Sequence, residues 1–218
     1  MNKTTKTGII LIAGIILTLS IFFFSVIKNT PPTIEEILNI NPTTTEVKKN
    51  EILSPTISIA DPQKGTDKAK ITIVEFADYG CSHCSETNQI LNELYNKFPQ
   101  DIKLVWKDFP FLPPTEVTWQ AHMAARCAGR QNKFWEYHDM LFTNQGNFNP
   151  DLFLKLAQSL NLDISSFTAC LNNEETKPLI KKSYTEGQNL EITGTPTFYI
   201  NGKLFNGEIT EQTIKDLL

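Results

Sequence analysis

Two cysteines separated by two residues, in the run Cys81-Ser82-His83-Cys84, are the side chains best suited to chemistry in this sequence. This spacing is used for redox reactions and for binding metals. The residues before the run, Ile71–Ala77, are rich in β-branched side chains and predict a buried strand. The residues after it are apolar at helical spacing until Pro99. We therefore expect the pair to lie where a strand ends and a helix begins.

A helix N-terminus stabilises a negative charge, because its first N–H groups are free and its dipole is positive there. We expect Cys81, at the start of the helix, to be the exposed nucleophile. Cys84 lies one turn further along and is expected to be the buried resolving thiol, while His83 adds a positive charge. A substrate thiolate would attack the Cys81 sulfur of the oxidised pair, and a second substrate thiol would release the product.

Two other interpretations of the pair are half of a zinc site and a structural disulfide. Zinc usually needs four ligands, often from two such pairs, but the remaining cysteines, Cys127 and Cys170, are single. We expect no metal, and no cofactor apart from the redox-active Cys81–Cys84 disulfide itself.

The first residues predict a membrane anchor. Residues 8–27 contain no charge, and about 20 such residues cross a bilayer as a helix. A cleaved signal peptide is the alternative, but its apolar part is usually shorter and ends in small residues, unlike Phe22-Phe23-Phe24. A buried core helix is disfavoured because the run has no polar face. Lys3 and Lys6 keep residues 1–7 in the cytoplasm by the positive-inside rule, so the following residues are expected to be exported.

The exported part is expected to begin with a linker. Residues 28–56 are rich in proline and threonine, which favours an extended tether. The alternation at Thr56–Ile59 indicates a first edge strand. A further strand at Asp101–Phe109 implies a parallel pair with a right-handed crossover through the helix after the cysteines.

The second half of the chain predicts helices and then a hairpin. From about residue 115 to about residue 190 the apolar spacing is helical, which indicates an inserted helical subdomain. Asn201-Gly202 between two apolar runs is a strong hairpin signal, and a last helix ends the chain. The predicted fold class is therefore α/β, in residues 57–218, preceded by the transmembrane helix.

This order of elements, together with three sequence runs, resembles the DsbA-like branch of the thioredoxin superfamily. The runs are Glu75–Cys84, Phe134–His138 and Thr193–Phe198. The resemblance covers the chain from about residue 57 onward. It implies a thioredoxin fold with a helical insertion and the activity of a protein thiol:disulfide oxidoreductase.

The resemblance also implies roles for individual residues. The Thr195–Pro196 bond is expected to be cis and to lie beside the cysteines, so that Thr195 can pair with an extended substrate segment. In this family His83 stabilises the thiolate. Glu75 corresponds to a buried acid that can relay protons to the resolving thiol, although strand alternation leaves an exposed edge glutamate open. Thr195 departs from the valine of some oxidases in the family, which leaves a reductase or isomerase open.

Cys127 and Cys170 lie in the helical insertion. Export favours a structural disulfide between them, and similar pairs occur in some DsbA-like proteins, while two buried free thiols are the alternative. His122 and His138 carry no motif and are expected to be structural. The tryptophans are expected in the core or at its rim, with a role in a substrate groove as the lesser alternative: Trp106, Trp119 and Trp135.

The expected function is that of a membrane-tethered extracytoplasmic oxidoreductase that introduces disulfides into exported proteins. Its expected partners are unfolded or exported thiol-containing proteins and a membrane protein that reoxidises the cysteine pair. The formal net charge of −4 gives no basic surface for nucleic acid, and no long apolar helix beyond the anchor indicates a dimer, so we expect a monomer. The alternatives are a reductase or isomerase and a tethered peptide-binding module or chaperone without redox turnover.

Overall fold

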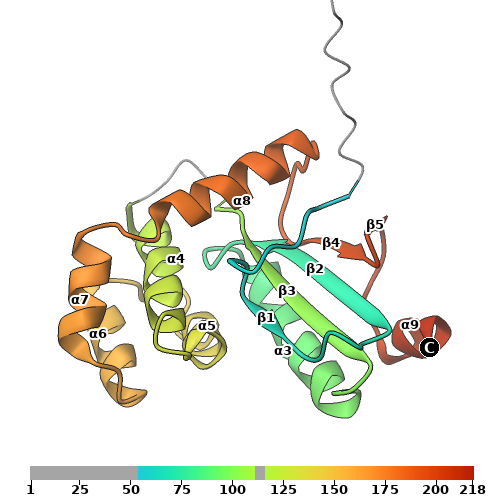
Figure 1. The fold of residues 1–218 in the computed structure, drawn as a ribbon, viewed down its shortest axis with the longest axis horizontal. Coiled ribbons are helices and arrows are strands. Elements are labelled where there is room, and N and C mark those ends of the chain that lie inside the picture. The colour runs from blue at the N-terminus through green and yellow to red at the C-terminus, as the bar shows by residue number, and fades with distance from the viewer. Residues whose placement is uncertain (1–53, 111–115) are drawn as a thin grey trace, which may run out of the picture. The chain divides into compact units, whose positions relative to one another are not determined.

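Residues 54–110 and 116–218 are described by the computed structural model, and Figure 1 shows their fold. The anchor predicted at residues 8–27 and the linker as far as residue 53 lie outside the described residues. None of the helices within 54–110 and 116–218 is both long and apolar enough to cross a membrane.

A sheet of five strands, in the order β1-β3-β2-β4-β5, lies at the centre of the fold. The strands β2 (Ile71–Ala77) and β3 (Ile102–Asp108) are parallel, with Ala77 opposite Asp108 at their carboxyl ends. The helix between them, α3 (Ser82–Lys97), makes the predicted crossover. The other strands are antiparallel to their neighbours and comprise β1 (Gln63–Lys64), β4 (Thr197–Ile200) and β5 (Lys203–Phe205).

The helices after β3 are α4 (Glu116–Gly129), α5 (Phe134–Thr143), α6 (Pro150–Ser159), α7 (Ile164–Asn172), α8 (Lys177–Asn189) and α9 (Glu211–Leu217). The first four of them pack together around small residues of α4, such as Ala121 and Ala125, and around Tyr137. This cluster meets the sheet through Ala77 and Trp106, near the carboxyl ends of β2 and β3. We call α4–α7 the helical subdomain.

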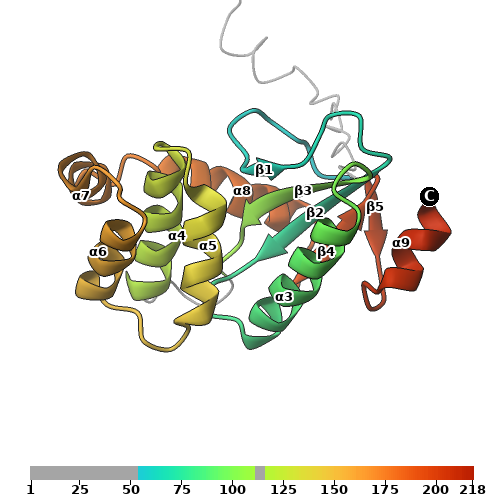
Figure 2. The same cartoon turned by 90° about the horizontal axis from the view of Figure 1, so that it is seen from below.

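Helices cover both faces of the sheet, because strand alternation sends apolar side chains to each face. Ile73 of β2 packs with Leu91 of α3, and Ile214 of α9 joins the same cluster. Phe76 of β2 points to the other face, where Tyr184 of α8 packs. Figures 1 and 2 show α3 and α8 on opposite sides of the sheet. The sequence predicts α8 as part of the helical insertion, but the structure places it on the sheet.

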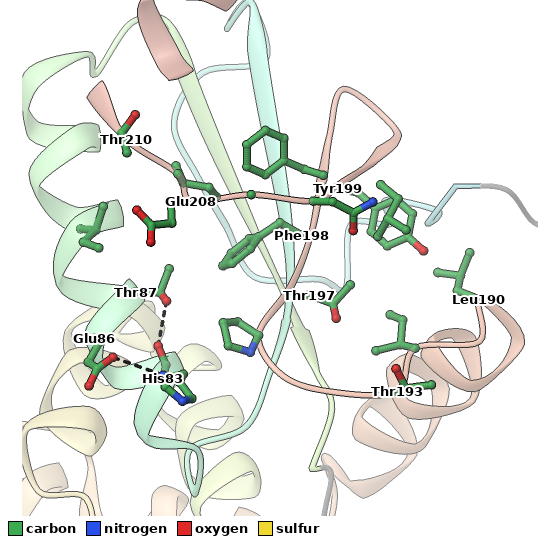
Figure 3. Close-up of a pocket in the computed structure, with 18 of the residues that line it drawn as sticks. His83, Glu86, Thr87, Leu190, Thr193, Thr197, Phe198, Tyr199, Glu208 and Thr210 are labelled. Atoms are coloured by element: carbon green, nitrogen blue, oxygen red, sulfur yellow. Dashed lines mark hydrogen bonds and ion pairs between the residues drawn. The ribbon is translucent and has the colours of Figure 1, made fainter. Parts of the chain in front are cut away.

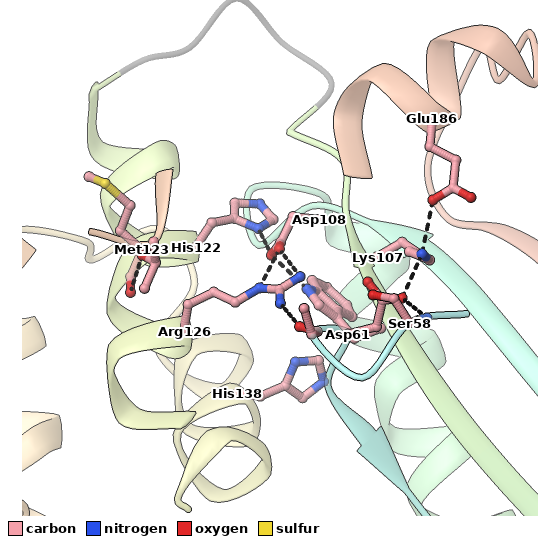
Figure 4. Close-up of polar contacts among 12 residues, drawn as sticks. Ser58, Asp61, Lys107, Asp108, His122, Met123, Arg126, His138 and Glu186 are labelled. Carbon is pink, nitrogen blue, oxygen red and sulfur yellow. Dashed lines mark hydrogen bonds and ion pairs between the residues drawn. The ribbon is translucent and has the colours of Figure 1, made fainter. Parts of the chain in front are cut away.

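The edge strand predicted at Thr56–Ile59 is wrong, since the first strand is β1. Asp61 closes a turn with Ser58, whose N–H donates to Asp61 Oδ2 at 2.7 Å, while Asp61 N–H donates to Ser58 O at 3.0 Å. Lys107 Nζ donates to the same Asp61 oxygen at 2.8 Å and to Glu186 Oε2 at 2.9 Å (Figure 4). This turn and its ion pairs outweigh the alternation and leave Ile59 fully exposed.

Candidate active site

The cysteine pair lies where the loop after β2 enters α3. Cys81 is the N-cap of α3, with an extended backbone (φ −88°, ψ 122°), and its Sγ accepts a hydrogen bond from the Cys84 N–H at 3.4 Å. Both thiols are free, but Cys81 is half-buried whereas Cys84 has 0% of its surface exposed. The fold therefore separates an accessible sulfur from a buried one.

Hydrogen bonds lower the pKa of the Cys81 thiol from 9.0 to about 5. The largest contribution is a hydrogen bond from the Cys84 thiol; burial opposes it, and the Thr195 side chain and the backbone N–H groups of Cys84 and His83 add to it. Burial, the hydrogen bond to Cys81 and the charge of Glu75 raise the pKa of Cys84 far above its ordinary range. At neutral pH Cys81 is therefore the thiolate and Cys84 the thiol.

His83 is exposed at the start of α3. Figure 3 shows its ring beside Glu86, and its Nδ1 lies 3.3 Å from Glu86 Oε2. The backbone N–H of His83 is one of the groups that lower the pKa of Cys81. A contribution of the imidazole ring to the thiolate stays a prediction.

The loop before β4 brings Thr195 against Cys81. The Thr195–Pro196 peptide bond is cis. Cys81 Sγ lies 3.3 Å from the carbonyl oxygen of Thr195, to which the thiol donates when it is protonated, although the two residues are 114 positions apart in the chain. Thr195 therefore contacts the Cys81 sulfur through its carbonyl oxygen and its side chain.

A groove of about 670 Å³ begins beside this contact and lies between α3, the segment after α8 and the β4–β5 hairpin (Figure 3). Pro196 is part of its wall. Ile90 and Leu204 contribute exposed apolar surface, with 42% and 52% of each residue accessible. The described residues that line the groove include no lysine or arginine, and its carboxylates are Glu86, Glu191 and Glu208. A groove of this volume and composition can hold an extended polypeptide segment.

Glu75 is buried beneath α3, with only 6% of its surface exposed. It shares a small cavity of about 10 Å³ with residues of the same face, including Asn88 and Leu91, and its Oε1 has no hydrogen-bond partner among the described residues. Burial, and then the negative charge of Cys81, raise the pKa of Glu75 from 4.5 to about 8. The buried position agrees with the relay role that the family resemblance implies, and that role stays a prediction.

Replacing Glu75 with glutamine is expected to stabilise the reduced protein increasingly as the pH rises. The stability associated with the protonated carboxyl is fully present below a pH of 4.5 and is lost as the pH passes through about 8. Glutamine cannot ionise, so the variant gains up to roughly 5 kcal/mol over the wild type above that range. Denaturant unfolding at about pH 5 and about pH 9 measures the difference.

The matched control for this prediction is Glu93→Gln, because Glu93 is an exposed glutamate on α3, the helix that covers Glu75. Its effect on the free energy of unfolding is expected to be the same at both pH values. If Glu75→Gln is equally insensitive to pH, the carboxyl of Glu75 is not held in its protonated form.

Below the cysteines, a buried polar network joins the sheet to the helical subdomain (Figure 4). His122 of α4 lies between two carboxylates, with Nδ1 2.7 Å from Asp108 Oδ1 and Nε2 3.2 Å from Asp78 Oδ1. Arg126 Nε donates to Asp108 Oδ2 at 2.7 Å. Burial disfavours a charge on His122, but the two carboxylates outweigh it and raise its pKa to about 8. Because Asp78 lies in the loop that leads into Cys81, this network fixes that loop.

A second histidine contacts the neighbouring residue of the same loop. The Tyr79 hydroxyl and His138 Nδ1 are 2.9 Å apart, and His138 Nε2 is 3.0 Å from Asn88 Oδ1. Burial is the main cause that lowers the pKa of His138 to about 4, so the ring is neutral. Its Nε2–H therefore donates to Asn88, and its Nδ1 accepts from Tyr79. The ring of Tyr79 stacks on Trp106 at 5.0 Å.

The structure thus shows what the sequence analysis missed. His122 and His138 carry no motif, and they contact Asp78 and Tyr79 through pairs 44 and 59 positions apart. One signal was available, because Asp78 and Asp108 lie at the carboxyl ends of two strands that the sequence predicts to be parallel, so their side chains meet at one edge.

Cys127 of α4 and Cys170 of α7 form a disulfide, with an S–S distance of 2.06 Å. It joins two helices of the helical subdomain and lies in the apolar core of that subdomain. Trp106 is also in this core, and Trp135 is half-buried against it, with Nε1 donating to Gln63 O at 3.0 Å. Within residues 54–110 and 116–218, no group of three or more His, Cys, Asp or Glu side chains is placed to hold a metal ion.

The strand order β1-β3-β2-β4-β5, the two cysteines at the N-terminus of α3 and the cis proline beside them together define a dithiol domain of the thioredoxin fold. Residues 58–218 match a family model described as thioredoxin. The chain belongs to this thioredoxin family. Its likeness to a solved DsbA-like protein is a likeness of fold.

Solved structures of similar fold cover most of the described residues. A thioredoxin-like oxidoreductase from Silicibacter pomeroyi DSS-3 is 26% identical, with a TM-score of 0.64, and the match covers 73% of this chain and 91% of that one. The thiol-disulfide exchange protein alpha-DsbA2 from Wolbachia pipientis has a TM-score of 0.66 over 78% of this chain and 91% of that one. At 22% identity, the second likeness is one of fold.

Curated relatives by sequence are much longer proteins. The Na(+)/H(+) antiporter NhaA 1 of Salinispora arenicola is 31% identical over 157 residues, which are 72% of this chain and 24% of that protein. This chain spans about a quarter of the length of the curated relatives it matches.

Proposed function

We propose that this protein is a thiol:disulfide oxidoreductase that introduces disulfide bonds into exported proteins. The observation that carries the proposal is the contrast within the cysteine pair. Cys81 is accessible with a pKa lowered to about 5, whereas Cys84 is buried with a raised pKa. A stabilised Cys81 thiolate favours the reduced form of the pair, and a protein whose reduced form is stabilised is a strong oxidant.

The reaction begins from the Cys81–Cys84 disulfide. A substrate thiolate attacks the Cys81 sulfur, a mixed disulfide forms, and Cys84 leaves as a thiolate that takes up a proton. Glu75, whose pKa is raised to about 8, is the nearby acid that can supply this proton. A second substrate thiolate then attacks the substrate sulfur of the mixed disulfide, and Cys81 leaves as a thiolate. The substrate loses two electrons and the cysteine pair gains them.

The substrate segment is expected to bind in the groove beside Pro196. Its exposed apolar side chains and its position next to Cys81 support an extended, unfolded segment rather than a folded surface. Thr195 adjoins the groove and can pair with the backbone of such a segment. The carboxylates of the groove favour segments that carry basic residues.

The location and the partner are proposed on sequence grounds. The uncharged residues 8–27 support a single-pass anchor, with residues 57–218 on the outer side of the membrane. In that position the protein meets thiol-containing proteins as they are exported, and it needs a membrane redox partner that reoxidises Cys81 and Cys84. Antiport, which appears in the names of the longer relatives, is not part of the proposal.

The reductase or isomerase alternative rested on Thr195. In the structure, a hydrogen bond from the Thr195 side chain lowers the pKa of Cys81, which supports the oxidising direction. The binding-module alternative would not need two free cysteines with opposite pKa shifts.

The test is to add catalytic amounts of the oxidised protein to a reduced dithiol peptide in the presence of excess glutathione disulfide. An oxidase is expected to accelerate formation of the peptide disulfide over the uncatalysed reaction. Reduction of an insulin disulfide with no oxidation of the dithiol would indicate a reductase. No change in either substrate would leave a binding module as the better account and overturn the proposal.

A further inference from the structure

The side chain of Gln145, in the turn after α5, reaches the loop that carries the nucleophile. Its Nε2 donates to the carbonyl oxygen of Tyr79 at 2.8 Å and to the carbonyl oxygen of Cys81 at 2.8 Å. These two carbonyls lie on either side of Gly80. The contacts join residues 66 and 64 positions apart, so they tie the helical subdomain directly to the backbone of the active site.

The second of these carbonyls belongs to the N-cap of α3. It also accepts the first hydrogen bond of the helix, from the Ser85 N–H at 3.3 Å, which is longer than the bond from Gln145. The direction of the Cys81 carbonyl restrains the backbone of that residue, which places Cβ and limits the rotamers that Sγ can adopt. In the structure Sγ faces the N–H of Cys84, a group that lowers the pKa of the thiol.

We propose that Gln145 is a positioning residue that holds the backbone on both sides of Gly80, so that the Cys81 sulfur faces the free N–H groups of α3. One NH₂ group serves two carbonyls and restrains the loop at two points. The donated N–H groups also offset the negative ends of these carbonyls, which would otherwise repel a thiolate beside them. Gln145 touches no reacting atom and acts only through Cys81.

The histidine contacts to the same loop are made to side chains and not to its backbone carbonyls. His122 holds the Asp78 side chain and His138 holds the Tyr79 hydroxyl. In the described residues, Gln145 supplies the side-chain hydrogen bond to the Cys81 backbone. Gln145 is half-buried and lines a surface cavity with Gly80, so a substitution there opens no void in the core.

The test is a titration of the Cys81 thiolate, followed by its absorbance near 240 nm, in the reduced full-length protein and in Gln145→Met. Methionine keeps the length of the side chain but donates no hydrogen bond. The pKa of Cys81 is expected to rise from about 5 by about one pH unit, so that alkylation at a pH near 5 slows about fivefold, in step with the thiolate fraction. Gln145→Ala is the second variant, and its titration decides the question if Gln145→Met does not fold.

The chain offers a matched control in Gln131, another half-buried glutamine of the helical subdomain. Its Nε2 donates to Asp163 O at 3.1 Å and its Oε1 accepts from Asp163 N–H at 2.8 Å, and none of these residues is near Cys81 or Cys84 in the chain. Gln131→Met removes hydrogen bonds of the same kind and is expected to leave the pKa of Cys81 unchanged, even if it destabilises the fold as much.

Two failures can be told apart in this experiment. If Cys81 of the unaltered protein titrates near its ordinary value of 9.0, the proposed function loses its main support. If the unaltered protein titrates near 5 and the Gln145 variants do so as well, the positioning role is overturned and the proposed function stands.

Discussion

Replacing Cys81 with serine is expected to abolish disulfide transfer. A serine hydroxyl cannot form a disulfide, so the pair can neither accept electrons nor form the mixed disulfide with a substrate. The loss follows from the geometry, since Cys84 is fully buried and its thiol is held protonated by burial and by Cys81. The measurement is oxidation of a dithiol peptide by catalytic amounts of protein, with wild type and variant at equal concentration.

Cys84→Ser is the matched variant for this experiment. It keeps the accessible Cys81 sulfur but removes the buried partner, so it is expected to form a mixed disulfide that Cys84 can no longer attack and that therefore persists longer than in the wild type. Mass spectrometry after reaction with an oxidised peptide would then show one peptide bound at Cys81. If Cys81→Ser still oxidises the peptide at the wild-type rate, or if Cys84→Ser traps nothing, the assignment of the two roles is wrong.

Asp108→Asn is expected to lower the free energy of unfolding by about 3–5 kcal/mol. The Asp108 carboxylate is fully buried, and it accepts from Arg126 Nε and Trp106 Nε1 at 2.7 and 2.8 Å while it pairs with His122 at 2.7 Å. Burial disfavours its charge, but Arg126 and His122 outweigh burial and hold its pKa below the usual range. Asparagine carries no charge, so Arg126 and His122 remain buried without the carboxylate of residue 108, which destabilises the folded protein.

The control is Asp101→Asn, because Asp101 forms a surface ion pair in which Lys70 Nζ is 3.8 Å away. Exposed pairs of this kind contribute about 0–1 kcal/mol. Denaturant unfolding of the three proteins at neutral pH measures both effects. Equal stabilities of Asp108→Asn and Asp101→Asn would contradict the claim that the polar network under the active site is held by charge.

The expected loss from Asp108→Asn also depends on pH. The stability that His122 gains as a cation is fully present below its unfolded pKa of 6.5 and is lost as the pH rises through about 8. The wild type therefore loses this contribution in alkaline solution.

The elements of the thioredoxin core could be predicted because their signals are local. Ile71–Val74 is an unbroken β-branched run, α3 has regular helical spacing, and Asn201-Gly202 can close a hairpin at positive φ. The motif around Cys81 indicates the family, and the family resemblance predicts that Pro196 lies beside the cysteines. These features follow from residues within one element or from a short motif.

The remaining features depend on contacts between distant residues. The alternation at Thr56–Ile59 predicts a strand, but the turn closed by Asp61 depends on Lys107 and Glu186, which come later in the chain. Gln145 likewise has no local pattern, since its importance comes from two backbone carbonyls that the fold brings to it. α8 could not be separated from the helical subdomain, because helical periodicity does not say which surface a helix covers.

The most direct test of the account is the reduction potential of the Cys81–Cys84 pair in the purified protein, equilibrated with mixtures of reduced and oxidised glutathione. Thioredoxin lies at about −270 mV and the strong oxidant DsbA at about −120 mV. The stabilised Cys81 thiolate predicts a potential well above that of thioredoxin. A potential near −270 mV would contradict the proposed direction and indicate that the same fold and the same cysteines serve a reductant.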